Sequence, residues 1–386
     1  MSGHDDYFSR LSAALREAGL FRPTLVIDRT RLDANIAAVK QTLAGTNLAT
    51  RIVVKSLPAH GLLDAIASGV GTQRFMVFNG PMLEEMARAH PSADFLLGKP
   101  LPATQAAQSL ERLGAVSPQW LIDTRERLAQ YAELARARAT PMRINLEIDV
   151  GLHRGGFATP AEVAGAVDAA QQAGLSVAGL MGYDPHVPKT PDPSRAYAAT
   201  QRAYAAAKAV VVEKLGADAA GLDWNGAGSP TYALHAQGTE CSEVAIGSAF
   251  VKPTDFDRKE LAHHAPAAFI ATPVLKALAR TEIPALEAAT SLFRFFDPAT
   301  ARAFYIHGGH WLAKPESPPG LKYSDLFGRS SNQELLTGPA GVDLAPDDYI
   351  FLRPTQSEAV FLQFGDIAVF DGEKISEMWP IFAVSA

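Results

Sequence analysis

The regular alternation of short apolar runs with Ala-rich or amphipathic segments between residues 51 and 246 most constrains how this chain can fold. Short apolar runs that end at turn residues predict buried strands, and apolar residues spaced three and four apart predict helices. Strands that are joined through helices lie parallel, because a parallel pair needs a long crossover connection. The runs that we interpret as strands are 51–55, 74–78, 94–97, 119–122, 143–149, 177–182, 222–225 and 243–246.

Eight parallel strands with helical crossovers can close into a barrel, so we expect an α/β fold with a (β/α)8 TIM barrel. An open doubly wound sheet is the alternative. It usually has fewer strands, and its G-x-G-x-x-G fingerprint is missing after the first strand. The crossover helices are predicted at 60–68, 81–90, 103–113, 125–137, 160–173 and 194–215.

The character of the sequence changes after about residue 266, where helical segments become scarce. We predict a barrel domain over residues 1–265 and an all-β domain over residues 266–386, with strand 23–28 as a candidate member of the β-domain. Helices are predicted on either side of that strand, at 5–20 and 31–39. The strand-like runs of the β-domain are 267–276, 302–306, 348–353, 359–363 and 366–370, and Asp371-Gly372 is a tight-turn signal.

The composition narrows the classes of partner. The net charge is -6 and no basic run is present, which argues against nucleic acid. The longest apolar stretches are too short to span a membrane, and the first residues lack the order of a signal peptide. A single cysteine, Cys241, cannot form an internal disulfide and fits a reducing compartment, so we expect a cytoplasmic protein.

Lys55 is the first candidate functional residue, because in such a barrel the chemistry takes place at the C-terminal ends of the strands. Its ammonium ends a buried run and is costly to bury alone, so it must be paired, hydrated or neutral. A neutral lysine is a nucleophile that forms a Schiff base with a carbonyl cofactor. The alternative is an ordinary exposed lysine in the loop after the strand.

Two segments have the composition of a phosphate site. Residues 225–232 follow the seventh strand, and their glycines let backbone N–H groups approach an anion while hydroxyl groups add donors. Gly247 and Ser248 follow the eighth strand and extend the same site. An ordinary Gly-Ser-Pro turn is the alternative. The candidates in the first segment are Asn225, Gly226, Gly228, Ser229, Thr231 and Tyr232.

Charged and titratable residues close the fifth and sixth strands. Arg154 offers bidentate hydrogen bonds to a ring nitrogen or a carboxylate, although a structural ion-pair cluster explains the same residue. His186 would suit proton abstraction near neutral pH if it lay near Lys55, although single histidines are often loop or core residues. Tyr183 is a candidate either for barrel filling or for a phosphate contact.

Five segments, PTLVIDRTRLDANI, VVKS, LEIDVGLHRGG, GLMGYDPH and VFDGEKISEMWPIF, occur in this order, with the Gly-Ser-rich loop before the last of them. Together they resemble the D-threonine aldolase and D-serine dehydratase family of alanine-racemase-like, fold-type III pyridoxal-phosphate enzymes. The resemblance runs from about residue 22 to the C-terminus. It implies an N-terminal barrel, a C-terminal β-domain, pyridoxal 5'-phosphate as cofactor, and a homodimer with active sites at the subunit interface.

The same resemblance implies roles for individual residues. Lys55 matches the Schiff-base lysine, His186 matches the histidine that acts as base in the aldolases, and Arg154 matches the strand-end arginine near the cofactor. The residues that match the cofactor and phosphate surroundings are Tyr183, the loop from Gly226 to Tyr232, Gly247 and Ser248.

One segment departs from the family pattern. The family carries a metal motif, Pro-x-His-x-Cys or Pro-x-His-x-Asp, where this chain has Pro354-Thr355-Gln356-Ser357-Glu358. Gln356 is a poor ligand beside imidazole, and Glu358 alone would hold a divalent ion weakly, so we expect the metal site to be lost or rebuilt. His307 and His310 are candidates to rebuild it with Glu358, or they form a surface turn.

The segment 314–334 also lies outside the recognised pattern, and its Arg329 is a candidate for binding a substrate carboxylate or a loop of a partner subunit. We expect a pyridoxal-phosphate-dependent lyase acting on a D-amino acid, by retro-aldol cleavage of a β-hydroxy-D-amino acid. D-serine dehydratase-like β-elimination and amino-acid racemisation are the alternatives within that class. A non-catalytic pyridoxal-phosphate carrier and a barrel hydrolase without the cofactor are the alternatives outside it.

Overall fold

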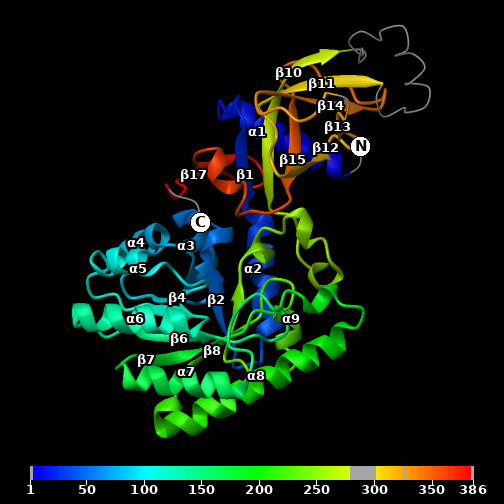
Figure 1. The fold of residues 1–386 in the computed structure, drawn as a ribbon. Helices are drawn as coiled ribbons and strands as arrows, with labels where there is room; N and C mark the ends of the chain where they lie inside the picture. The colour runs from blue at the N-terminus through cyan, green and yellow to red at the C-terminus, as the bar shows by residue number, and fades with distance from the viewer. Residues whose placement is uncertain (1–2, 279–300, 326, 384–386) are drawn as a thin grey trace.

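The computed structural model describes residues 3–278, 301–325 and 327–383, which form two units (Figure 1). Strands β2 to β9 form a closed parallel barrel with helices around it. A second, mostly antiparallel sheet lies above the barrel in this view, with helix α1 beside it. The (β/α)8 barrel and the separate β-sheet unit that the sequence predicted are confirmed.

The barrel strands begin and end within two residues of their predicted positions. They are β2 (Ala49–Val53), β3 (Arg74–Val77), β4 (Asp94–Leu97), β5 (Gln119–Ile122), β6 (Arg143–Glu147), β7 (Ser176–Met181), β8 (Asp223–Gly226) and β9 (Glu243–Ile246). None of the helices in the described parts of the chain is both long and apolar enough to cross a membrane. The helices of this unit are α2 (Arg29–Leu43), α3 (His60–Val70), α4 (Gly80–Ala89), α5 (Ala103–Leu110), α6 (Arg125–Arg138), α7 (Pro160–Gln172), α8 (Pro193–Leu215) and the short α9 (Tyr232–His235).

Polar residues fix where several crossover helices begin. The side chains of Asn79, Thr124 and Thr159 each accept a hydrogen bond from a backbone N–H in the first turn of the helix that follows. These N–H groups would otherwise lack partners at a helix start. Thr159 and Glu162 form a reciprocal capping box, with Pro160 at the first helical position. The local sequence therefore sets the helix starts that follow β3, β5 and β6.

The strand at 23–28 belongs to the second unit. This strand, β1 (Thr24–Asp28), pairs antiparallel with β10 (Ala268–Leu278) and parallel with β16 (Ile367–Phe370). Helix α1 (Gly3–Glu17) covers one face of the sheet, where the Phe8 ring packs against Phe269 and Phe351. The other strands are β11 (Arg302–His307), β12 (Ala313–Ser317), β13 (Lys322–Tyr323), β14 (Gln333–Gly338), β15 (Tyr349–Pro354) and β17 (Ile375–Trp379).

The predicted strand at 359–363 is wrong, because Phe361–Gln363 form a 3-10 turn, η9. Val360 and Phe361 are fully buried, so this run is apolar because it fills the core and not because it pairs in a sheet. The sequence also failed to predict β12, β13, β14 and β17. Three of these, β12, β13 and β17, have largely polar or exposed side chains, which weakens the apolar pattern that reveals a strand.

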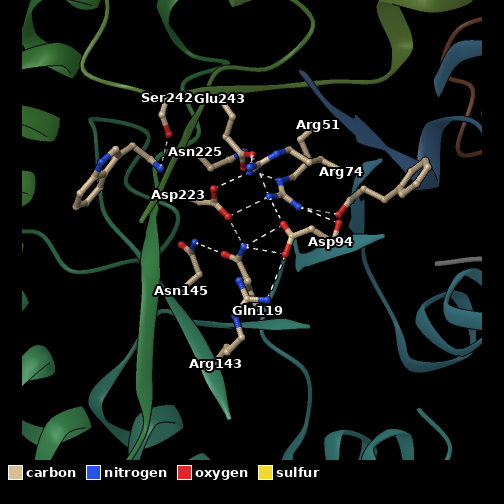
Figure 2. Close-up of polar contacts among 12 residues, drawn as sticks. Arg51, Arg74, Asp94, Gln119, Arg143, Asn145, Asp223, Asn225, Ser242 and Glu243 are labelled. Atoms are coloured by element: carbon tan, nitrogen blue, oxygen red, sulfur yellow. Dashed lines mark hydrogen bonds and ion pairs between the residues drawn. The ribbon is translucent and has the colours of Figure 1, made fainter. Parts of the chain in front are cut away.

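A cluster of charged and amide side chains fills the N-terminal end of the barrel (Figure 2). Arg51 of β2 lies at its centre and is fully buried. Its Nε is 2.5 Å from Oε1 of Glu243, and its Nη2 is 2.6 Å from Oδ2 of Asp94. Arg74 donates to Asp223 at 2.6 Å and to Glu243 at 2.8 Å. The members that begin a barrel strand are Arg74, Asp94, Gln119, Arg143, Asp223 and Glu243.

The cluster is balanced in charge, because three arginines (Arg51, Arg74, Arg143) meet three carboxylates (Asp94, Asp223, Glu243). A buried ion is tolerated only when opposite charge and hydrogen bonds replace its water. The polar cluster therefore fills this end of the barrel and links strands that are not neighbours in the sheet.

Arg51→Met is expected to lower the free energy of unfolding by about 3–5 kcal/mol, because it leaves buried carboxylates without their central partner. Chemical denaturation of both chains measures the difference. Arg143→Met is the matched control, since Arg143 also contacts Asp94, at 3.3 Å, but its side chain is 38% exposed. We expect Arg143→Met to lower the free energy of unfolding by only about 0–1 kcal/mol. Equal losses in the two variants would contradict the role given to burial.

Candidate active site

A cavity of about 450 Å³ opens at the C-terminal mouth of the barrel, the end opposite the polar cluster. All eight barrel strands, or the loops that follow them, contribute to its wall, together with Phe256 and Glu358. Its size suits a small molecule, and its position is where barrels of this kind place their chemistry. The sequence-predicted residues in the wall are Lys55, Arg154, Tyr183, Asn225, Gly228, Ser229, Gly247 and Ser248.

Lys55 lies in the short 3-10 turn Val54–Ser56 (η1) that follows β2. Its Nζ is 3.8 Å from Oε1 of Glu358 and 4.5 Å from the centre of the Phe78 ring. The side chain is 33% exposed, so the ammonium is partly hydrated and has one carboxylate at the outer edge of ion-pair distance. A lysine held this loosely leaves Nζ accessible to a carbonyl carbon that enters the cavity.

Two serines orient Glu358, the acidic partner of Lys55. Ser56 Oγ donates to Oε2 of Glu358 at 3.2 Å, and Ser248 Oγ donates to Ser56 Oγ at 3.2 Å. Glu358 follows β15 in the second unit, so this unit supplies a carboxylate to the mouth of the barrel. The sequence singled out Glu358 only as a weak metal ligand and did not indicate its contact with Lys55.

Ser229 holds the loop after β8 against the turn after β9. Its Oγ accepts the N–H of Gly247 at 3.1 Å and the N–H of Ala249 at 3.0 Å. Both acceptor positions are then used, so the hydroxyl proton of Ser229 is free to be donated to an anion in the cavity. Gly228 has no room for a side chain, because a Cβ there would lie 2.8 Å from the Tyr183 ring.

Glu147, the last residue of β6, lines the cavity and was not a candidate from the sequence. Its side chain is 9% exposed, and Oε1 is 3.9 Å from Nη2 of Arg154. Burial raises the pKa of Glu147 to about 7; Arg154 opposes this, and Asp123 and Asp149 add to it. The carboxyl therefore exchanges a proton near neutral pH, as a general acid or base must. An acidic residue within the apolar run of β6 was the signal available in the sequence.

Arg154 and Tyr183 lie side by side in the wall, with the guanidinium carbon 5.1 Å from the centre of the tyrosine ring. The Arg154 side chain is 58% exposed, so it is held loosely. Burial raises the pKa of Tyr183, which keeps its phenol neutral at physiological pH. The wall as a whole carries as many cations as carboxylates: Lys55, Lys99 and Arg154 against Asp123, Glu147 and Glu358.

Four of the residues predicted for catalysis or cofactor binding lie outside the wall, and two of them are His186 and Gly226. His186 is partly buried, and its Nδ1 has no hydrogen-bond partner among the described residues. Its Nε2 lies 3.0 Å from the position that a Cβ on Gly151 would take, which places it beside the loop after β6. Gly226 packs against the thiol of Cys241, with no room for a side chain.

The other two are Thr231 and Tyr232, whose hydroxyl groups are already bound within the protein. Thr231 Oγ1 donates to Asp184 at 2.6 Å. The Tyr232 Oη lies 2.9 Å from Nε2 of His263 and 2.7 Å from Nε2 of His264. These contacts give both residues a role in shaping the loop after β8.

The residues considered for a metal are spread over separate places. His307 and His310 do not line the cavity; the His307 carbonyl accepts from Thr272 and the His310 N–H donates to Glu334. Gln356 Nε2 donates to Asp255 at 3.0 Å. Within residues 3–278, 301–325 and 327–383, no group of three or more His, Cys, Asp or Glu is arranged to hold a metal ion.

Arg329 is engaged inside the β-sheet unit. It forms an ion pair with Glu334, donates to the carbonyl of Trp311 at 3.1 Å, and lies 3.9 Å above the ring of Tyr323. These contacts use the guanidinium to hold its own loop against β13, β14 and the turn that precedes β12.

The wall could hold a phosphorylated aromatic aldehyde. Lys55 offers an amine for the aldehyde, Tyr183 offers a flat apolar surface, and Ser229, which lies against the Gly247-Ser248 turn, offers its hydroxyl proton to a phosphate. Gly228 and Gly247 are a second indication that the cavity binds a ligand, because side chains at these positions would narrow the side of the cavity that the loops form.

Comparison with known proteins gives one family match. Residues 27–254 match the family described as alanine racemase, N-terminal domain. No curated protein sequence matches the chain.

Solved structures with this fold cover almost the whole chain. A D-threonine aldolase from Filomicrobium marinum is 19% identical, with a TM-score of 0.73 over 94% of this chain and 95% of its own. A D-threo-3-hydroxyaspartate dehydratase from a Delftia species is 17% identical, with a TM-score of 0.73 over 93% and 97%. An alanine racemase from Bacillus anthracis is 14% identical, with a TM-score of 0.69 over 94% and 98%. At these identities the likeness establishes the fold alone.

Glu147→Gln is expected to remove a pH dependence of stability. The pKa of Glu147 is raised on folding from 4.5 to about 7, so the folded state binds more protons and stability falls as pH rises through that window. Urea unfolding at several pH values should show a shallower fall for Glu147→Gln than for wild type. Glu126→Gln, at an exposed helix position, controls for the loss of a carboxylate, and identical slopes in all three chains would contradict the raised pKa.

Proposed function

The chain belongs to the alanine racemase N-terminal domain family of fold-type III pyridoxal-phosphate enzymes, and from that premise we propose that it is a pyridoxal-phosphate-dependent lyase acting on a D-amino acid. The proposed reaction is retro-aldol cleavage of a β-hydroxy-D-amino acid, which breaks the Cα–Cβ bond and releases an aldehyde. The resemblance of the sequence motifs to the D-threonine aldolase and D-serine dehydratase group supports this choice within the family.

Lys55 at the mouth of the barrel is the observation that carries the proposal. It faces a cavity of about 450 Å³ and has only Glu358, at 3.8 Å, as an ion partner among the described residues. Lys55 would hold the cofactor through its aldehyde, and Ser229 with the turn Gly247-Ser248 would hold the phosphate. When bound, pyridoxal phosphate supplies an electron sink for a bond broken at the Cα of the amino acid.

Cleavage of the Cα–Cβ bond requires a base that takes the proton of the β-hydroxyl. We assign this role to His186, which the family resemblance indicates. Its Nδ1 is buried without a hydrogen-bond partner in the described part of the chain, so the ring is not committed to a structural contact there. Arg154, beside Tyr183, would place positive charge next to the bound cofactor.

Glu147 favours β-elimination as the second candidate. A carboxyl with a pKa of about 7 in the cavity wall can protonate a leaving β-hydroxyl, which departs as water. The elimination also removes the Cα proton, and water then hydrolyses the unsaturated amine that remains, so the products would be a 2-oxo acid and ammonia, in place of an aldehyde and a shorter amino acid. An aldolase structure and a dehydratase structure share this fold, so the fold is compatible with either reaction.

The proposal includes the organisation of the chain. Residues 1–265 would form the barrel domain and residues 266–386 the β-domain, with β1 contributed to the β-domain, as its pairing with β10 and β16 supports. We propose a cytoplasmic homodimer, following the family resemblance.

Lys55→Ala is expected to abolish the visible absorbance band that purified wild type should show with pyridoxal phosphate, because no amine remains to bind the aldehyde at that position. Borohydride should make the wild-type adduct permanent, and peptide mapping should find it on Lys55. Lys99→Ala is the matched control, since Lys99 is another lysine of the same cavity wall, and should keep the band. A wild-type chain without a band would refute the proposed function.

His186→Asn is expected to lower aldehyde release from β-hydroxy-D-amino acids by about 10²–10⁴-fold, which is the usual contribution of a general base. Glu147→Gln should lower it less. The assay measures aldehyde and 2-oxo acid separately for each chain. If wild type releases 2-oxo acid and Glu147→Gln is the more damaged variant, elimination replaces cleavage as the reaction.

A further inference from the structure

A chain of buried hydrogen bonds lies directly behind the cavity wall, between the loops that follow β7 and β8. The N–H of Gly228 donates to Thr231 Oγ1 at 3.1 Å, and Thr231 Oγ1 donates to Asp184 Oδ1 at 2.6 Å. Nε2 of His235 lies 3.0 Å from Asp184 Oδ2. Asp184 and Thr231 have 0% exposure and His235 has 2%. The chain therefore ties Asp184, which adjoins Tyr183 of the wall, to the loop that contains Gly228.

The hydrogen bonds on the far side of His235 define its protonation state. Nδ1 lies 2.8 Å from Thr239 Oγ1, which donates its own proton to Oε1 of Gln201 at 3.2 Å. That atom of Gln201 is an oxygen, because it also accepts the N–H of Glu240 at 2.9 Å. Thr239 must therefore accept a proton from Nδ1, while the Asp184 carboxylate accepts one from Nε2. Both ring nitrogens carry hydrogen, so His235 is an imidazolium.

The surroundings of His235 agree with a charged ring. Burial lowers the pKa of His235, but the hydrogen bond and charge of Asp184, with a contribution from Cys241, raise it to about 9. Another titratable group that faces the ring is the phenol of Tyr197, whose ring packs edge-on with its centre 5.2 Å from that of the imidazole. Burial raises the pKa of Tyr197, so this phenol stays neutral. The Asp184–His235 pair is thus an ion pair at neutral pH, and it loses its positive partner and keeps the negative charge of Asp184 as pH rises through about 9.

We propose that the buried Asp184–His235 ion pair positions the loop 227–230 to receive the phosphate group of the cofactor. The inference rests on the proposed function, because it takes this loop as part of the phosphate site. Neither residue lines the cavity, so both act through Thr231, Gly228 and Tyr183. Lys55 lies in the turn after β2 and has no bond to the pair among the residues described, so the lysine end of the site is unaffected.

The test compares two ligands, pyridoxal 5'-phosphate and pyridoxal, which share the aldehyde and differ in the phosphate. In Asp184→Asn and in His235→Gln, we expect the affinity for pyridoxal phosphate to fall about tenfold or more, the usual effect of losing a hydrogen bond to a charged group. The affinity for pyridoxal should stay within about twofold of wild type, because the lysine end is intact. Equilibrium titration followed by absorbance or tryptophan fluorescence measures both.

Asp64→Asn is the control, because it removes a carboxylate that lies 3.3 Å from His90, away from the cavity wall. It should change neither affinity. Wild type that binds neither ligand would refute the proposed function itself. Wild type that binds both, with variants that lose the two affinities equally or lose neither, would overturn the positioning role and leave the proposed function standing.

A titration of the wild-type chain provides a test that no folding defect can obscure. The affinity for pyridoxal phosphate divided by the affinity for pyridoxal should fall as pH rises from about 8 to about 10, because His235 loses its proton over this range. It should approach the value of the Asp184→Asn chain. The phosphate is already doubly charged, since its second pKa is about 6, and the lysine contributes equally to both ligands. Cys241→Ser should still show a fall, moved to lower pH because Cys241 helps to raise the pKa of His235, and this excludes the thiol as the group that titrates. A constant ratio would overturn the inference.

Discussion

The buried ion cluster around Arg51 is the interaction on which the rest of this structure depends. Its charges lie on β2, β3, β4, β6, β8 and β9, and the fully buried Arg51 and Glu243 could not lie there without partners of opposite charge. Because the partners come from non-adjacent strands, the cluster forms only when the barrel is closed. It stabilises one end of the barrel and leaves the other end to be shaped by loops.

Asn225 connects the two ends. Its side-chain amide donates to Glu243 of the cluster at 2.8 Å, while the residue itself lines the cavity. Beyond Asn225, Ser229 joins the loop after β8 to the turn after β9. The hydrogen bonds among Thr231, Asp184 and His235 support the loop after β8 from behind the wall. The site is therefore supported by buried polar contacts at several depths, which suits loops that must hold an anion in a defined place.

The second unit contributes a carboxylate to the cavity wall. Glu358 reaches the barrel mouth from the turn after β15 and is held there by Ser56. Its carboxylate lies 3.8 Å from Lys55, so the electrostatic environment of the lysine depends on both units. Strand β1, from the start of the chain, lies between β10 and β16 and fastens the second unit to the residues that lead into the barrel.

The barrel and its helices were predictable from the sequence, because apolar periodicity and helix caps are local properties of consecutive residues. The strands β12, β13 and β17 were not, since their polar or exposed side chains hide the apolar pattern. The run around Phe361 was predicted as a strand because residues that fill the core are also apolar. Lys55, Arg154 and Ser229 could be nominated because barrels place the ends of their strands at one mouth.

The sequence by itself determined the fold class, the position of the mouth and the lysine that faces it. Only the tertiary structure decided which neighbours surround these residues. It placed Glu147 in the wall, paired Glu358 with Lys55, and directed the hydroxyls of Thr231 and Tyr232 into the protein. The physical reason is that burial and charge pairing are set by residues far apart in the chain, while periodicity and capping are set by neighbours.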